Sequence, residues 1–386
     1  MTELSRVLGG MALVCLLVTG PGAVAEEQGS AIFVRVLVAE ALDEATVCGL
    51  DMTVLDADTR LPLVSAPEDC VKLWPGEKGV RYGTGVGETE RLAVTTPAVF
   101  VTLNGHEFRS PLEFRLKDRL LIAISHMALE QYLPGIVAGE MPSYWPMEAL
   151  KAQAVVARTY AWNRVVASAD APYDLVSDVR DQVYPGSDGD SVRAAQAVKA
   201  TRGIVLVLNG QVADARYHST CGGATELPSN VWPGAGPGLQ GVRCSYCKDS
   251  PFAKWHLELT GERLARALKQ VGFDGDRVTQ IDVTRRSRSG RALQVKVLGD
   301  EDTVTLDGNT FRKAIGYGVL RSTRFVVREE AGTFQFEGQG FGHGVGLCQW
   351  GARRMALDGR SAEEILDFYY PGTERRRLVV TPSRAF

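Results

Sequence analysis

The sequence has no excess of positive charge, no periodic glycine and no internal repeat. Its 43 Lys and Arg against 46 Asp and Glu leave a net charge of −3, which excludes a broad basic face for duplex nucleic acid. Its 41 glycines follow no fixed period, which excludes a collagen-like chain. Balanced charge and 45% apolar residues exclude intrinsic disorder and a coiled coil. The 386 residues therefore form either one large globular domain or two to three domains.

A single apolar run approaches membrane length, and it lies at the N-terminus. Residues 7–18 are mostly apolar, and residues 23–25 have a small-x-small cleavage pattern. We therefore predict a signal peptide over residues 1–25 and a mature chain that begins at Glu26. The alternative is a membrane anchor, but the run is short for a hydrocarbon core of about 30 Å. The protein is expected outside the cytoplasm (periplasm, cell envelope or secreted), with no membrane span after signal cleavage.

The predicted secondary structure of the remaining chain changes from strands to helices near Ala128. Residues 31–39 and the short runs after them are β-rich and are separated by Gly, Pro and Asp. Beyond the change, residues 147–166 are alanine-rich with few breakers and predict a long helix. We expect an α+β fold, with a β-rich N-terminal region over 26–109. A catalytic domain of mixed helices and antiparallel strands should follow over 110–386.

Three shorter patterns make local predictions. Pro134 is tolerated only in the first turn of a helix, so the helix that contains it should be short. Residues 203–217 have the pattern of a hairpin that turns at Asn209-Gly210. Ser361 and Glu364 form a capping-box sequence that should open a helix.

Six cysteines remain after the signal peptide, and an oxidising compartment favours disulfides between them. Cys48 and Cys70 both lie in or beside the β-rich region and could close a loop. Three of the remaining cysteines lie within 27 residues of one another and are considered next.

Cys221, Cys244 and Cys247 combine with His218 into H-x2-C followed by C-x2-C. Two short chelating pairs on tight turns are typical of structural zinc held by three thiolates and one imidazole. The alternative is one or two disulfides, although the cysteines of a C-x2-C seldom bond to each other in a structural disulfide. We predict one structural zinc ion.

Glu140 is the first candidate for catalysis. It lies between two expected helices, in a segment rich in Met, Pro, Trp and Tyr144. Apolar surroundings raise the pKa of a carboxyl group and suit it to general acid catalysis. Lys151 and Arg158 are seven residues apart on the next helix, so one helix face carries both toward the same cleft. The alternative is a surface glutamate with two solvated basic residues.

The segment 338–352 alternates glycine with functional side chains. Glycine lets the backbone approach a ligand closely or adopt a positive φ. The segment is not a phosphate-binding loop, because no βαβ unit surrounds it. A lone histidine such as His343 is more often structural, but Gln349 and Trp350 after it favour a role facing a sugar.

Together these motifs resemble the SpoIID/LytB family, the stage II sporulation protein D-like peptidoglycan enzymes. The resemblance covers roughly residues 110–375, while the β-rich residues before it match less specifically. It is carried by Leu129-Glu-x-Tyr-Leu-x-Gly-Ile-Val-x-x-Glu140-Met-Pro, Trp145-Pro-x-Glu-Ala-Leu-Lys-Ala-Gln-Ala-Val-x-Ala-Arg-Thr-Tyr, Gln182-Val-Tyr-x-Gly186, His218-Ser-x-x-Gly-Gly-x-Thr225, Gly342-His-Gly-Val-Gly-Leu-x-Gln-x-Gly-Ala352 and Phe368-Tyr-Tyr-Pro-Gly-Thr373.

The resemblance implies a lytic transglycosylase that cleaves the bond between N-acetylmuramic acid (MurNAc) and N-acetylglucosamine (GlcNAc), preferring strands stripped of stem peptides. The family's catalytic acid falls on Glu140, and its supporting basic residues fall on Lys151 and Arg158. Some members bind zinc through a histidine and cysteines in the region of the cysteine motif. Cys348 is a departure, since the family usually has serine there. Further contacts with substrate are expected from Tyr144, Gln182, Tyr217, His343 and Gln349.

One carboxyl group suffices for this reaction. Protonated Glu140 would donate to the glycosidic oxygen, and the resulting carboxylate would take the proton of the muramyl 6-hydroxyl, which closes a 1,6-anhydro ring. No water nucleophile is needed. Glu148 is the nearest second acid and is expected to serve as a helix N-terminal charge.

Two other functions stay open beside the enzyme that acts on peptidoglycan glycan strands. One is a non-catalytic wall-binding module that enhances a cell-wall amidase, which would then be a partner. The other is a zinc hydrolase that uses His218 and His343. Three thiolates fill a zinc site and leave little room for water, which argues against the hydrolase.

Overall fold

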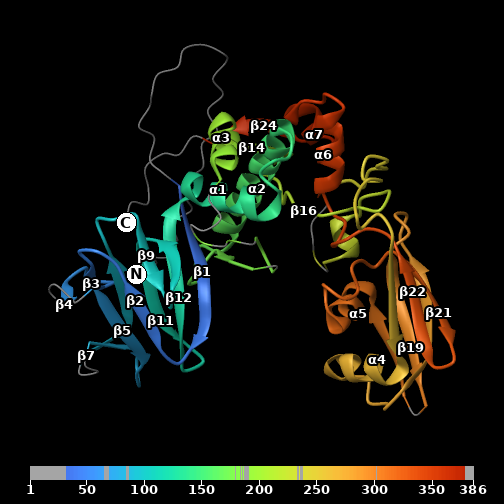
Figure 1. Cartoon of the computed structure of the whole chain (residues 1–386), viewed down its shortest axis with the longest axis horizontal. Coiled ribbons are helices and arrows are strands. Elements are labelled where there is room, and N and C mark those ends of the chain that lie inside the picture. The colour runs from blue at the N-terminus through green and yellow to red at the C-terminus, as the bar shows by residue number, and fades with distance from the viewer. Residues whose placement is uncertain are drawn as a thin grey trace, which may run out of the picture.

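The computed structural model describes residues 32–378 except 65–68, 84–86, 179, 183, 185, 187–190, 233, 235–237 and 301. The predicted signal peptide lies outside the described residues. Within them are seven α-helices and mostly antiparallel sheets, which confirms the α+β prediction. Figure 1 shows a β-rich part at one side, a helical part in the middle and a smaller part with α4 and α5 at the other side. No helix among the described residues is both long and apolar enough to span a bilayer.

The first third of the chain is built from strands. They are β1 (Phe33–Leu42), β2 (Ala45–Cys48), β3 (Thr53–Asp56), β4 (Pro62–Val64), β5 (Cys70–Pro75), β6 (Val80–Tyr82), β7 (Gly87–Thr89), β8 (Arg91–Thr95), β9 (Phe100–Leu103), β10 (His106–Arg109), β11 (Leu112–Lys117) and β12 (Leu120–Ala128). With β13 (Leu175–Val176), they form a seven-stranded sheet in the order β13-β1-β12-β11-β8-β3-β4 and a six-stranded sheet in the order β10-β9-β2-β5-β6-β7.

The sheets explain two of the sequence predictions. Cys48 on β2 lies opposite Cys70 on β5, and the two form a disulfide, as their positions suggested. Strands β11 and β12 pair with β8 and β1 in the same sheet, so the β-rich part extends to Ala128 rather than ending at residue 109. The predicted boundary was too early because pairing between distant strands leaves no local mark in the sequence.

The helical part is organised around α2 (Met147–Ala167), which confirms the strongest helix prediction. Its neighbours are α1 (Leu129–Glu140), α3 (Val192–Ala200), α6 (Gln349–Leu357) and α7 (Ala362–Tyr369). Buried alanines along α2 have small side chains, so the neighbouring helices can pack closely against it. Ser361 and Glu364 form the predicted capping box at the start of α7.

Helix α1 corrects the prediction from Pro134. It has 12 residues, and Pro134 lies inside it rather than in its first turn. Proline removes one backbone hydrogen bond from the helix. Tertiary packing offsets that loss, because Tyr132, Leu133 and Ile136 are fully buried. The helix therefore continues to Glu140 and presents this residue at its C-terminal end.

A third part has a hydrophobic core of its own. It comprises η3 (Lys269–Val271), β17 (Trp255–Thr260), α4 (Gly261–Leu268), β18 (Val278–Arg286), β19 (Ala292–Gly299), β20 (Thr303–Asp307), α5 (Gly308–Ile315), β21 (Phe325–Glu330) and β22 (Thr333–Gly338). Two three-stranded sheets, β17-β22-β21 and β18-β19-β20, surround that core together with α4 and α5. The segment predicted as one catalytic domain therefore contains two hydrophobic cores.

The chain between α3 and the third part brings distant motifs together. β14 (Ile204–Leu208) and β15 (Gln211–Val212) form the predicted hairpin, and Asn209 and Gly210 have the positive φ values that its turn requires. β24 (Glu374–Arg377), from the C-terminal end of the described chain, extends this sheet. η2 (Pro228–Asn230) lies between the hairpin and the third part. β16 (Tyr217–His218) leaves the hairpin and pairs in parallel with β23 (Leu347–Cys348). The glycine-rich segment thereby lies beside the His218 motif.

Candidate active site

Glu140 and Gln349 meet at the centre of the site. Glu140 is the last residue of α1 and is half-buried. Gln349 is the first residue of α6 and is buried. Its Nε2 donates a hydrogen bond of 3.1 Å to Oε2 of Glu140 across a sequence separation of 209 residues. The structure therefore joins the first and the glycine-rich motifs at one carboxyl group.

The loop after Glu140 offers aromatic surface on two sides. Trp145 is buried and packs edge-on against Trp350, with ring centroids 5.1 Å apart. The guanidinium of Arg353 lies 5.2 Å from the Trp350 centroid and covers this pair. Tyr144 instead is 78% exposed. An exposed ring within a few residues of Glu140 suits the apolar face of a sugar, as the sequence analysis expected of Tyr144.

Two phenols lie within electrostatic reach of Glu140. Burial raises the pKa of Tyr217 well above its usual value, and the negative charge of Glu140 adds to the effect. The pKa of Tyr132 is raised mainly by burial, with a smaller contribution from Glu140. Both hydroxyls therefore stay protonated and can act as neutral hydrogen-bonding groups.

Gln182 links these phenols and is itself fully buried. Tyr132 donates from its hydroxyl to Oε1 of Gln182 at 3.2 Å, and Nε2 of Gln182 donates to the Tyr217 hydroxyl at 3.2 Å. The sequence analysis expected Gln182 to contact substrate, but a fully buried side chain does not favour that role. Its amide instead holds the Tyr217 hydroxyl in position through the hydrogen bond.

Arg158 is buried by neighbouring elements and does not face the open cleft that the sequence analysis expected. Its side chain is 0% exposed, and Nε and Nη2 bind both carboxylate oxygens of Glu130 at 2.7 and 2.9 Å. The same guanidinium also reaches the carbonyls of Val198 and Ile204. Arg158 therefore fastens α1, α2, α3 and β14 together, and it supports the position of Glu140 through the helix that both Glu130 and Glu140 belong to.

The buried pair leads to a stability prediction. Glu130→Ala leaves the Arg158 guanidinium buried without its carboxylate, so the free energy of unfolding should fall by about 3–5 kcal/mol. Urea unfolding followed by circular dichroism measures the change. Lys151→Ala is the matched control on α2, because its pair with Glu148 is partly exposed and worth about 0–1 kcal/mol. Equal small effects in both variants would show that the Arg158 cluster does not stabilise the fold.

Lys151 and Glu148 form a separate pair near the N-terminal end of α2, about two turns before Arg158. Nζ of Lys151 lies 2.7 Å from Oε1 of Glu148, and Oε2 of Glu148 accepts the N–H of Ala362 at the start of α7. Glu148 lies in the first turn of α2, as predicted for a helix N-terminal charge. Lys151 and Arg158 thus share a helix face, as their spacing predicted, but Lys151 is partly exposed beside Glu148 and Arg158 is buried against Glu130.

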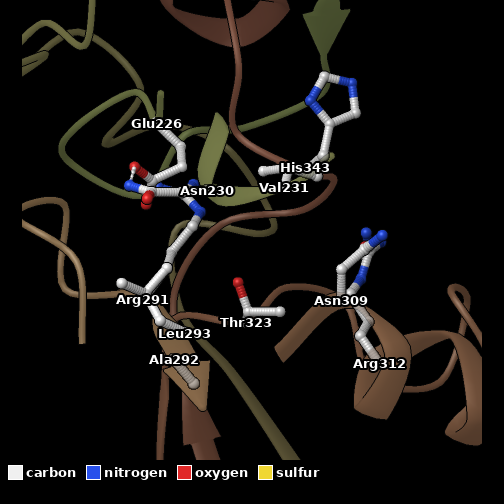
Figure 2. Close-up of a pocket in the computed structure, with 10 residues that line it drawn as sticks. All are labelled: Glu226, Asn230, Val231, Arg291, Ala292, Leu293, Asn309, Arg312, Thr323 and His343. Carbon is white, nitrogen blue, oxygen red and sulfur yellow. Dashed lines mark hydrogen bonds between the residues drawn. The ribbon is translucent and has the colours of Figure 1, made fainter. Parts of the chain in front are cut away.

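His343 lines a small cavity between the segment around η2 and the third part of the fold (Figure 2). In that view the Arg291 side chain points toward Glu226 and Asn230, whereas the His343 ring points away from them. The free volume is about 10 Å³, enough for one water molecule and too small for a sugar ring. This cavity therefore cannot hold a sugar ring.

The environment of His343 indicates a packed rather than a titrating residue. Its Nδ1 accepts the N–H of Val345 at 3.0 Å, and its ring packs edge-on against Trp232 at 4.9 Å. Burial holds the pKa of His343 well below its usual range, so the ring stays neutral. The sequence prediction of a substrate contact by His343 stays a prediction.

Four buried cysteines form a cluster beside the active site. The Sγ atoms of Cys221, Cys244, Cys247 and Cys348 all lie within 4.8 Å of one another. In a tetrahedral zinc site with Zn–S bonds of about 2.3 Å, sulfur atoms are about 3.8 Å apart. The Cys348 sulfur accepts the backbone N–H of Cys221 at 3.2 Å, and such N–H groups stabilise thiolates. The donor set therefore fits a tetrahedral metal ion.

His218 does not belong to this cluster, so the predicted fourth ligand is wrong. It lies opposite Cys348 in the β16–β23 pair, and its Nδ1 is 3.1 Å from the carbonyl oxygen of Val345. Its ring also faces His343, at a centroid distance of 5.6 Å. Cys348 takes the fourth place because strand pairing brings it in from the glycine-rich segment. Its presence where the family usually has serine was the one sequence signal for it.

Comparisons with known proteins show what the chain is similar to. The family model described as stage II sporulation protein matches residues 117–208, and a domain of unknown function (DUF8618) matches residues 245–346. An uncharacterized protein of Brachyspira hyodysenteriae is 34% identical over 274 residues, 71% of this chain and 73% of its own. Stage II sporulation protein D of Bacillus subtilis is 32% identical over 304 residues, 74% of this chain and 85% of its own. The amidase enhancer of the same organism is 29% identical over 62% of this chain and 40% of its own length.

Proposed function

Because the chain belongs to the SpoIID family, we propose that it is an extracytoplasmic lytic transglycosylase of peptidoglycan. It would cleave MurNAc–GlcNAc bonds, leave 1,6-anhydro-MurNAc ends and prefer glycan without stem peptides. The hydrogen bond from Gln349 to Glu140 is the observation that carries the proposal. The acidic side chain is held by a neutral amide, and exposed Tyr144 follows it four residues later in the chain.

In the proposed reaction Glu140 acts first as an acid and then as a base. The protonated carboxyl gives its proton to the glycosidic oxygen as the bond to the muramyl anomeric carbon breaks. Gln349 stabilises the carboxylate that results and keeps it oriented. The carboxylate then accepts the proton of the muramyl 6-hydroxyl while that oxygen bonds to the anomeric carbon. The first acid is regenerated, and no water is consumed.

We also propose that the four cysteines hold one structural zinc ion. Four thiolates complete a tetrahedral shell, so the ion would contribute folding energy rather than activate water. Cys348 is the N-cap residue of α6, and Gln349 follows it as the first helical residue. The cluster therefore fixes the start of α6, and with it the amide that holds Glu140.

Digestion of purified glycan tests the reaction. Denuded strands and strands with stem peptides are incubated with the full chain in water enriched in oxygen-18, and the products are identified by mass spectrometry. We expect 1,6-anhydro ends, which are one water lighter than hydrolytic ends, and no oxygen-18 in the new ends. Denuded strands should be cut faster. Labelled reducing ends would identify a hydrolase and overturn the proposal.

The similarity to an amidase enhancer favours a second candidate function, enhancement of a cell-wall amidase. In that case the chain binds glycan and raises the rate of the amidase without breaking glycosidic bonds. The two functions separate when Glu140→Gln is added to an amidase assay. A non-catalytic enhancer keeps its full effect in this variant, whereas an effect that depends on strand cleavage is lost.

A further inference from the structure

An open hollow lies where the cysteine cluster meets the third part of the fold. It has a volume of about 350 Å³, within the range of about 300–1,000 Å³ typical of ligand sites. Cys244 lines it on one side, and Arg288 and Ser289, from the turn between β18 and β19, line it on the other. The rest of the wall comes from Gly223, Ala224, Arg243, Ser245 and Arg324. The third part carries two of the three arginines and coincides with the domain of unknown function.

Three arginines face this hollow without an acidic partner. Arg243 and Arg288 are exposed, and Arg324 is half-buried. Within the described part of the chain, none of their guanidinium groups forms a salt bridge or a side-chain hydrogen bond. Most other arginines near them are engaged: Arg286 and Arg291, for example, donate to backbone carbonyls. The hollow thus collects positive charge that the protein does not neutralise.

Two glycines leave space for the Arg324 side chain at the hollow. A Cβ at Gly223 would lie 3.0 Å from Nη1 of Arg324, and a Cβ at Gly290 would lie 3.6 Å from its Nε. Both glycines have a positive φ, so two turns leave room for the guanidinium. Arg324 also helps to lower the pKa of buried Arg291, after the larger effect of burial, because the two positive charges lie close together. An anion in the hollow would relieve this repulsion.

A buried carboxylate that contacts the lining residue Ser289 does not supply that anion. Oε2 of Glu226 accepts hydrogen bonds from the hydroxyls of Ser287 and Ser289. Its Oε1 accepts from Asn230 and from the N–H of Leu227. These bonds outweigh burial and lower the pKa of Glu226, so it is a satisfied anion on the inner side of the turn. The arginines that line the hollow are left for an external ligand.

We propose that this hollow binds the free lactyl carboxylate of MurNAc in a glycan strand from which stem peptides have been removed. The inference rests on the proposed function. Removal of a stem peptide at its first amide bond leaves one carboxylate on each MurNAc, whereas an intact strand has an uncharged amide there. A guanidinium fork binds a carboxylate with two parallel hydrogen bonds, so arginine distinguishes these two groups.

The path through the cysteine cluster connects this hollow with the reacting carboxyl. Cys244 lines the hollow, and its sulfur lies within 4.8 Å of that of Cys348. Cys348 precedes Gln349, which binds Glu140. A chain of direct contacts thus joins the residues that would bind the strand to the residue that holds the acid. The preference for denuded glycan would then come from Arg243, Arg288 and Arg324 rather than from Glu140.

The test compares two glycans in a binding assay that does not need turnover. Denuded strands are used as they are or after their lactyl carboxylates have been converted to methylamides. Binding to the full chain carrying Glu140→Gln is measured by calorimetry, with and without Arg243→Ala and Arg288→Ala together. Both arginines are exposed, so the fold should persist. Arg263→Ala, an exposed arginine on α4, is the matched control.

We expect the double variant to bind denuded strands at least about tenfold more weakly, because each charge-assisted bond contributes substantially. Its binding to amidated strands should equal that of the parent. Equal binding of both glycans by the parent, or no change in the double variant, would overturn the inference even if turnover confirms the transglycosylase. If turnover is absent but the carboxylate dependence holds, only the proposed function fails. A phosphodiester wall polymer serves as a third ligand in the same assay. If the double variant lost binding only to that polymer and not to denuded glycan, the inference would also be overturned.

Discussion

Glu140→Gln should lower the turnover of denuded glycan by about 10²–10⁴-fold, the usual effect of losing a general acid–base group. Glutamine has nearly the same shape as glutamate, and its carbonyl oxygen can still accept the hydrogen bond from Gln349. The variant should therefore keep its fold and its glycan affinity, and the loss should appear in kcat rather than in KM. Initial rates of anhydro-end formation, together with thermal unfolding, measure both quantities.

Glu148→Gln provides the matched control for this prediction. It makes the same chemical change in the other carboxyl group considered from the sequence. Glu148 is bound to Lys151 and to the N–H of Ala362, so its replacement should affect stability by about 1 kcal/mol and leave turnover within a few-fold. Near-normal turnover in Glu140→Gln would contradict the assignment of the acid. A large loss in both variants would point to two cooperating carboxyl groups.

The sequence was informative where structure depends on neighbouring residues. The alanine-rich segment predicted α2, Asn209-Gly210 predicted a hairpin turn, and Ser361 with Glu364 predicted the start of α7. Each of these patterns acts within a few residues, through propensity, backbone conformation or capping. The disulfide between Cys48 and Cys70 could also be suggested from the sequence, because the two cysteines are only 22 residues apart.

Predictions failed where contacts between distant segments decide the outcome. The spacing of Lys151 and Arg158 gave their positions around α2 but not which side α3 and β14 would cover. Arg158 is consequently buried against Glu130, which the sequence analysis did not single out. In the same way, H-x2-C is a reasonable chelating pair, but the parallel pairing of β16 with β23 brings in Cys348 and turns His218 toward Val345.

The choice between these ligand sets leads to a second prediction with a large expected effect. Cys348→Ser should lose most of its zinc, whereas His218→Asn should keep about one zinc per chain. Elemental analysis of protein purified without chelator gives the stoichiometry. The parent protein should contain one zinc per chain. Less than about half a zinc, with Cys221, Cys244 and Cys247 found in disulfides, would rule out the metal in favour of the usual extracytoplasmic chemistry.

Loss of the metal should also reach the active site. Binding free energy at a structural zinc site is folding free energy, so Cys348→Ser or a chelator should lower the melting temperature by about 10 °C or more. Turnover per folded molecule should fall as well, since Cys348 caps α6 and Gln349 begins it.

The double variant Cys48→Ser with Cys70→Ser is the control, because it removes the disulfide of the β-rich part and leaves the four-sulfur cluster intact. If that variant lost zinc while Cys348→Ser retained it, the cluster would not be the metal site. If both retained zinc but only Cys348→Ser lost turnover, Cys348 would act on Gln349 by packing alone.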